Sequence, residues 1–153
     1  MTSSRTTVTG HFTFADWKET PVGPEGPENP GSPGDAAGAE AAYPRLAHAT
    51  VTNAFSGGIE AEATVCDYAI AYLTKETGTF AGMERVTGRV DGRAGTFVAE
   101  ERGVFAADGT VRCTLEVVEG SGTGELTGLR GSGGFTYRHG EEKVAYAFAY
   151  ELE

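Results

Sequence analysis

The chain has 153 residues and a formal net charge of −10, from 22 acidic and 12 basic residues. This length suits one domain with its own hydrophobic core, and the acidic balance argues against a nucleic-acid partner, which requires a basic surface. No apolar run approaches the roughly 20 residues of a membrane span, and the first residues lack the apolar segment of a secretory signal. We therefore expect a bacterial-type cytoplasmic protein with no membrane partner.

A proline- and glycine-rich segment follows the first predicted strand. Residues 19–44 contain all six prolines of the chain, together with five acidic residues and no basic one. Proline lacks a backbone N–H and fixes φ, so this density disfavours both helix and interior strand. We predict an acidic loop inserted between the first and second strands of a single domain, 1–153. This loop is either a solvated connection or a lid over a cavity mouth.

The rest of the chain alternates apolar and polar side chains with the period of a β-strand. Tight turns separate the runs, among them the hairpin signals Asp91-Gly92 and Asp108-Gly109. The predicted strands span residues 8–17, 47–55, 59–73, 80–90, 96–105, 111–118, 133–138 and 143–152.

Consecutive strands without a helical pattern predict an all-β fold, a single closed antiparallel barrel of about eight strands with meander topology. Closure removes the exposed edges that otherwise invite aggregation. The interior of such a barrel is either filled by side chains or open to one small ligand. A two-sheet sandwich is the alternative.

The strand at 59–73 decides where several carboxylates lie. Its even-numbered side chains are bulkier than its odd-numbered ones, which are mostly alanine and valine, so we predict that the even face points inward. Glu60 and Glu62 would then lie about 6.5–7 Å apart and converge with Glu84, and Glu101 would join them. Burial and mutual repulsion raise a carboxyl pKa, as a general acid requires, so Glu60, Glu62 and Glu84 are the candidate catalytic residues. In the alternative, Glu60 and Glu62 lie on a solvated outer face and the alanines point inward.

Large side chains on the predicted inward faces form either a packed core or the wall of an apolar pocket. The candidate ligand-binding residues are Tyr68, Tyr72, Phe80, Phe97, Glu101, Tyr146 and Phe148.

Two other features predict structure rather than chemistry. Cys66 and Cys113 are too few for a disulfide framework or a structural zinc site, so we expect buried thiols, no metal and no cofactor. Residues 120–134 hold seven glycines in fifteen residues but lack the lysine of a phosphate-binding loop. We predict a bulged connection there, with Leu126 and Leu129 closing one end of the barrel.

Three blocks of the sequence are distinctive: Gly120-Ser-Gly-Thr-Gly-Glu-Leu126 and Glu84-Arg-Val-Thr-Gly88, with Thr9-Gly-His-Phe12 near the start. Together they resemble one bacterial family, the domain of unknown function 3224. The resemblance covers about residues 8–152 apart from the proline-rich segment. It implies a lipocalin-like, allene-oxide-cyclase-like (calycin) barrel and no assigned activity. Related barrels bind small apolar ligands or steer cyclisations and isomerisations without a cofactor.

Three functions remain in competition. The first is binding of a small apolar or amphipathic molecule inside the barrel. The second is a cofactor-independent cyclase or isomerase of small-molecule metabolism, with cavity glutamates as acid and base. The third is a structural or interaction protein with a filled barrel, and the oligomeric state stays open, a homodimer included. A cavity of roughly 300 Å³ or more favours the first two.

Overall fold

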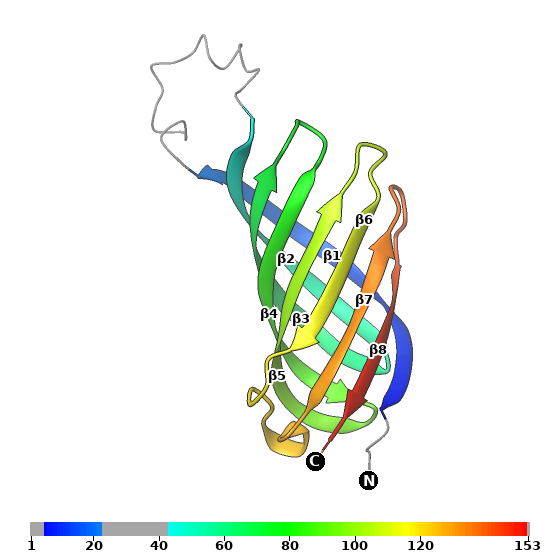
Figure 1. Ribbon diagram of the computed structural model, residues 1–153. Coiled ribbons are helices and arrows are strands. Elements are labelled where there is room, and N and C mark those ends of the chain that lie inside the picture. Colours follow the sequence, from blue (N-terminus) through cyan, green and yellow to red (C-terminus); the bar gives the residue numbers. More distant parts are fainter. Residues whose placement is uncertain (1–4, 23–42, 153) are drawn as a thin grey trace.

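The computed structural model describes residues 5–22 and 43–152, and its strands follow one another around a closed barrel in the order β1 to β8 (Figure 1). The elements are β1 (Thr6–Val22), β2 (Arg45–Gly57), β3 (Ile59–Tyr72), β4 (Gly78–Val90), β5 (Arg93–Phe105), β6 (Val111–Val117), η1 (Gly124–Leu126), β7 (Arg130–Tyr137) and β8 (Val144–Glu151). The predictions of an all-β fold and a closed antiparallel meander are confirmed.

Every strand pairs antiparallel with its neighbour, and the barrel closes where β1 pairs with β8 from Thr6↔Tyr150 to Phe12↔Val144. Asp91 and Gly92 both have positive φ, 54° and 85°, and form the two-residue turn between β4 and β5. This is the turn whose twist matches that of the flanking strands, as the Asp-Gly pair predicts.

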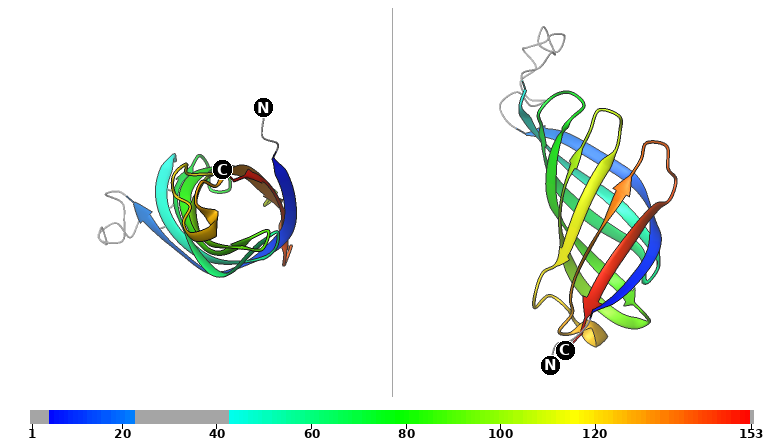
Figure 2. Two further views of the ribbon diagram at one scale, coloured as in Figure 1. Left: turned by 90° about the horizontal axis from the view of Figure 1, so that it is seen from below. Right: turned by 45° about the vertical axis from the view of Figure 1, so that its right-hand side comes forward.

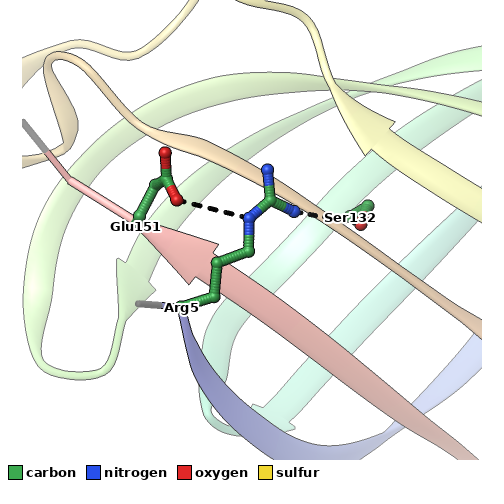
Figure 3. Close-up of polar contacts among 3 residues, drawn as sticks. All are labelled: Arg5, Ser132 and Glu151. Atoms are coloured by element: carbon green, nitrogen blue, oxygen red, sulfur yellow. Dashed lines mark hydrogen bonds and ion pairs between the residues drawn. The ribbon is translucent and has the colours of Figure 1, made fainter. Parts of the chain in front are cut away.

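A side-chain contact also spans the seam of the barrel. The Arg5 guanidinium donates to Glu151 Oε1 on β8 at 3.4 Å and to Ser132 Oγ on β7 at 3.3 Å (Figure 3). Arg5 is exposed, so this contact contributes at most about 1 kcal/mol to stability.

The first strand is longer than its sequence predicts. β1 continues through Glu19 and Pro21 to Val22, which pairs with Leu46, so the predicted loop at 19–44 is wrong at its first residues. β8 accompanies β1 only as far as Phe12, and the remainder of β1 is paired on one side, where a proline is tolerated. Residues 23–42, the remainder of the predicted loop or lid, lie outside the described residues.

The η1 segment lies across part of one end of the barrel (Figure 2, left), and side chains close this end. Leu126 and Leu129 are fully buried there and join the hydrophobic cluster, as predicted. β6 ends opposite Ala99, so the preceding stretch of β5 lacks a strand partner on that side. Polar side chains of the glycine-rich connection replace it: Ser121 Oγ, Thr123 Oγ1 and Glu125 Oε1 accept from the backbone N–H groups of Val98, Thr96 and Ala94 at 2.8–3.1 Å.

A bulge in β3 reverses the face of its first residues. Thr64 pairs with Asn53 and Ala61 with Phe55, so Glu62 and Ala63 together oppose Ala54 alone. Both bulged residues therefore point outward, which is the usual effect of one extra residue in a strand. From Thr64 onward the even-numbered side chains face inward, as predicted, whereas Glu60 and Glu62 are exposed on the outer surface.

Candidate functional site

The interior is packed at the closed end and hollow toward the other end. A cavity of about 220 Å³ opens at the end formed by the β3–β4, β5–β6 and β7–β8 turns. Its lining is aliphatic and aromatic, with one amide and three tyrosine hydroxyls as its polar groups: Phe12, Phe14, Trp17, Val51, Asn53, Tyr68, Ile70, Tyr72, Phe80, Phe105, Val111, Phe135, Tyr137 and Val144.

Trp17 and Phe14 are 51% and 45% exposed although both line the cavity, so the cavity is accessible from solvent. A bulge aims the tryptophan there: Asp16, with φ 61°, and Trp17 together oppose Val51 on β2. The Trp17 ring lies 6.2 Å from that of Tyr68. Aromatic rings held at the rim of an open apolar space are typical of a small-molecule site.

Asn53 and Tyr68, which we call the cavity floor, carry the polar groups at the inner limit of the cavity. Asn53 Nδ2 donates to Glu84 Oε2 at 2.8 Å, and the Tyr68 hydroxyl donates to Glu101 Oε1 at 2.9 Å. Asn53, Glu84 and Glu101 also border a small space of about 10 Å³ below the floor. The floor thus separates the cavity from a buried pair of carboxyl groups.

The register of β3, β4 and β5 explains how these groups meet. Tyr68 pairs with Gly82, and Gly82 pairs with Glu101, so the tyrosine reaches across a residue without a side chain. A Cβ at Gly82 would lie 2.7 Å from the Tyr68 ring. One row further along, Glu84 lies between Cys66 and Ala99. Thr64 on β3 donates a hydrogen bond to Glu84 as well.

The surroundings of Glu101 favour the protonated form of its carboxyl group. Burial raises its pKa to about 9, and a hydrogen bond with Glu84 and the charge of Glu84 act in the same direction. The protonated Glu101 can donate to Glu84, which also accepts from Asn53 and Thr64. Three donors converging on one buried carboxylate offset much of the loss of hydration.

The two cysteines belong to the same cluster and are free. Cys113 Sγ lies 3.7 Å from Glu101 Oε1, and the ligand-type atoms of Cys66, Glu84 and Glu101 lie within 4.8 Å of one another. A metal ion would have to displace the protons of this cluster. Burial raises the pKa of both thiols, and no sealed polar side-chain atom of the described residues lacks a hydrogen bond. The residues therefore fit a protonated, hydrogen-bonded cluster better than a metal centre.

The prediction that Glu60, Glu62 and Glu84 converge inside the barrel is wrong. Glu84 is buried, but the β3 bulge turns Glu60 and Glu62 to the outer surface, and the second carboxyl partner is Glu101. Of the predicted ligand-binding residues, Tyr68, Tyr72 and Phe80 line the cavity. The prediction of a cavity wall is wrong for a second group, which packs in the closed half and lies outside this lining: Phe97, Tyr146 and Phe148.

Sequence reasoning did not single out Asn53, Thr64 or Trp17. Asn53 shares its face of β2 with Val51 and Phe55, and a polar residue between two inward apolar ones was a usable signal. Trp17 reaches the cavity only through the bulge at Asp16, for which the sequence offers no glycine or other marker.

The fold and site define a closed antiparallel β-barrel with one sealed end and one aromatic cavity over a buried carboxyl pair. The chain belongs to the family described as "Protein of unknown function (DUF3224)", whose model matches residues 8–150. It is similar to the crystal structure of a DUF3224 protein of unknown function from Shewanella oneidensis MR-1, with 29% identity and a TM-score of 0.67. That match covers 97% of this chain and 98% of the other. No curated protein matches this chain.

The described residues include no helix with the length and apolarity to cross a membrane.

Proposed function

We propose that this protein binds a small, largely apolar molecule in the open half of its barrel. The observation that carries the proposal is the aromatic cavity, sealed below by the packed half of the barrel and reached past the exposed rings of Trp17 and Phe14. Folding normally buries large aromatic rings, and these two stay exposed in the folded protein. A bound ligand would cover them and remove this exposed apolar surface from water.

The volume limits the ligand to about one ring. At about 220 Å³ the cavity lies below the roughly 300 Å³ expected from the sequence for a ligand-binding barrel, at which drug-sized pockets begin, although the interior is not filled. It exceeds the ~150 Å³ of an engineered apolar cavity that binds benzene. A single six-membered ring with a few substituent atoms is therefore the expected size, and long acyl chains are not.

Toluene is a suitable probe, because binding should bury the Trp17 indole and shift its fluorescence. Trp17 is the only tryptophan of the chain, so the signal reports on the rim alone. Val51→Phe places a ring inside the cavity and should abolish saturable binding, whereas Val65→Phe adds the same ring on the outer face, where Val65 is 55% exposed. Absence of saturable binding, or equal binding to both variants, would contradict the proposal.

A second candidate, an acid–base isomerase or cyclase, draws support from one contact. The pKa of Glu101 is raised by burial, and its carboxyl group accepts a hydrogen bond from Tyr68, which borders the cavity. This pair could relay a proton to or from a bound carbonyl compound.

Deuterium exchange at the α-carbon of cyclohexanone tests this candidate. Glu101→Gln keeps the shape and removes the titrating proton, so catalysed exchange should fall by roughly 10²–10⁴-fold. If the protein does not accelerate exchange at all, binding without catalysis remains the proposed function. If Glu101→Gln accelerates exchange as much as the unmodified protein does, Glu101 is not the acid–base group.

A further inference from the structure

The hydrogen bonds at the cavity floor have a fixed direction. Glu84 borders the small space below the floor and is absent from the cavity lining, and Asn53 Nδ2 donates to it. The oxygen of the same planar amide lies on the other branch, away from Glu84, and Asn53 lines both the cavity and the small space below it. The amide thus presents an acceptor, and not a donor, to the cavity.

The Asn53 side-chain oxygen has no partner among the described residues, since the only hydrogen bond of this amide is the one through its nitrogen. Asn53 is 5% exposed, yet no sealed side-chain nitrogen or oxygen in the described part of the chain lacks a partner. The oxygen must therefore border open space. A buried acceptor left without a donor is unfavourable, so a ligand that supplies one gains affinity.

The remainder of the lining carries no charge. None of the cavity residues is acidic or basic, and two of them, Asn53 and Tyr72, donate hydrogen bonds to the carboxyl groups of Glu84 and Glu19. A ligand carboxylate would lose its hydration without meeting a cation, and would lie near like charge. The lining therefore favours an uncharged ligand.

We propose that the cavity selects an uncharged single-ring molecule bearing one hydroxyl or amino group, which donates a hydrogen bond to Oδ1 of Asn53. Phenol and aniline are the simplest members of this class. The inference rests on the proposed binding function and adds the polar group and its direction to it.

The first test compares ligands on the unmodified protein by calorimetry or Trp17 fluorescence. Phenol is the donor, benzonitrile is a ring of similar polarity that only accepts, and toluene has neither group. Benzoate and benzylamine, which is cationic at pH 7, supply the two charges. Phenol and aniline should bind about tenfold more tightly than benzonitrile, and benzoate should not bind.

The second test changes the acceptor. Asn53→Leu keeps a similar volume and removes the amide, so the preference for phenol over toluene should fall by about tenfold, while toluene binds at least as well as before. The ratio of the two affinities is compared between the two proteins, so the difference between phenol and toluene in the free energy of transfer from water cancels. Thermal unfolding shows whether the variant is folded. If the variant does not fold, the comparison of ligands on the unmodified protein still tests the inference.

The outcomes separate this inference from the binding function. If none of the uncharged rings binds, both fail. If toluene binds but phenol is no tighter than benzonitrile, the donor preference is refuted and the binding function stands. Tighter binding of benzylamine than of phenol, or an unchanged ligand preference in Asn53→Leu, would likewise overturn the inference.

Discussion

Replacing Glu101 by glutamine should flatten the dependence of stability on pH. Glu101 is 3% exposed, and its pKa rises from 4.5 to about 9 in the folded protein. A glutamine can accept from Tyr68 through its oxygen and donate to Glu84 through its nitrogen. It therefore imitates the protonated carboxyl group without binding a proton.

The sign and size follow from proton linkage. Between about pH 5 and pH 8 the folded protein holds the Glu101 proton and the unfolded chain has lost it, so the free energy of unfolding falls as pH rises. The slope is about 1.4 kcal/mol per pH unit for one proton, giving at most about 4 kcal/mol over three units. Above pH 8 the thiols of Cys66 and Cys113 begin to ionise in the unfolded chain and would confuse the comparison.

Urea unfolding of both proteins at pH 5, 6, 7 and 8 measures the effect. Glu101→Gln should be more stable than the unmodified protein at pH 8, and this advantage should shrink toward pH 5. Glu100→Gln changes the exposed neighbour on the outer face and serves as the control, with the slope of the unmodified protein. Parallel pH profiles for Glu101→Gln and the unmodified protein would show that Glu101 is not protonated in the folded state.

Three further substitutions and one control, Leu46→Ala, test the architecture by urea unfolding. Leu126→Ala should lower the free energy of unfolding by about 2–5 kcal/mol, because Leu126 is fully buried at the closed end, whereas Leu46→Ala on the outer face should change it by less than about 1 kcal/mol. Thr123→Val keeps the shape but removes the acceptor of the Thr96 N–H, and should cost about 0.5–1.5 kcal/mol because water can reach this exposed group. Gly82→Ala places a methyl group against the Tyr68 ring and the Asp67 carbonyl, and should destabilise by about 1–3 kcal/mol; an unchanged stability would show that the ring is free to move.

The strands and their inward faces were predictable because apolar inward side chains alternate with polar outward side chains along a half-buried strand. Glu84 and Glu101 fall on faces shared with Val86 and Phe97, and both are buried as this pattern requires. The Asp91-Gly92 turn was equally predictable, since few other pairs adopt positive φ twice in succession.

The bulges were not predictable in the same way. The stretch Glu60-Ala-Glu-Ala63 alternates perfectly, so the pattern is compatible with either face and hides the extra residue. Only the pairing with β2 shows that Glu62 and Ala63 share one partner. A one-residue shift exchanges the two faces of a strand, which is why the prediction failed before the bulge and held after it.

The position of the carboxyl pair explains why a barrel would keep such groups in its interior. The hydrophobic core around Leu126 is stable without a buried acidic group. The raised pKa of Glu101 makes the free energy of unfolding lower at neutral pH than at pH 5. The pair lies at the boundary between the packed half and the cavity, where its hydrogen bonds fix the Asn53 amide and the Tyr68 hydroxyl in one orientation. A ligand that meets an acceptor already oriented has less to rearrange on binding, so the stability lost to a buried acid can be recovered as selectivity for the ligand.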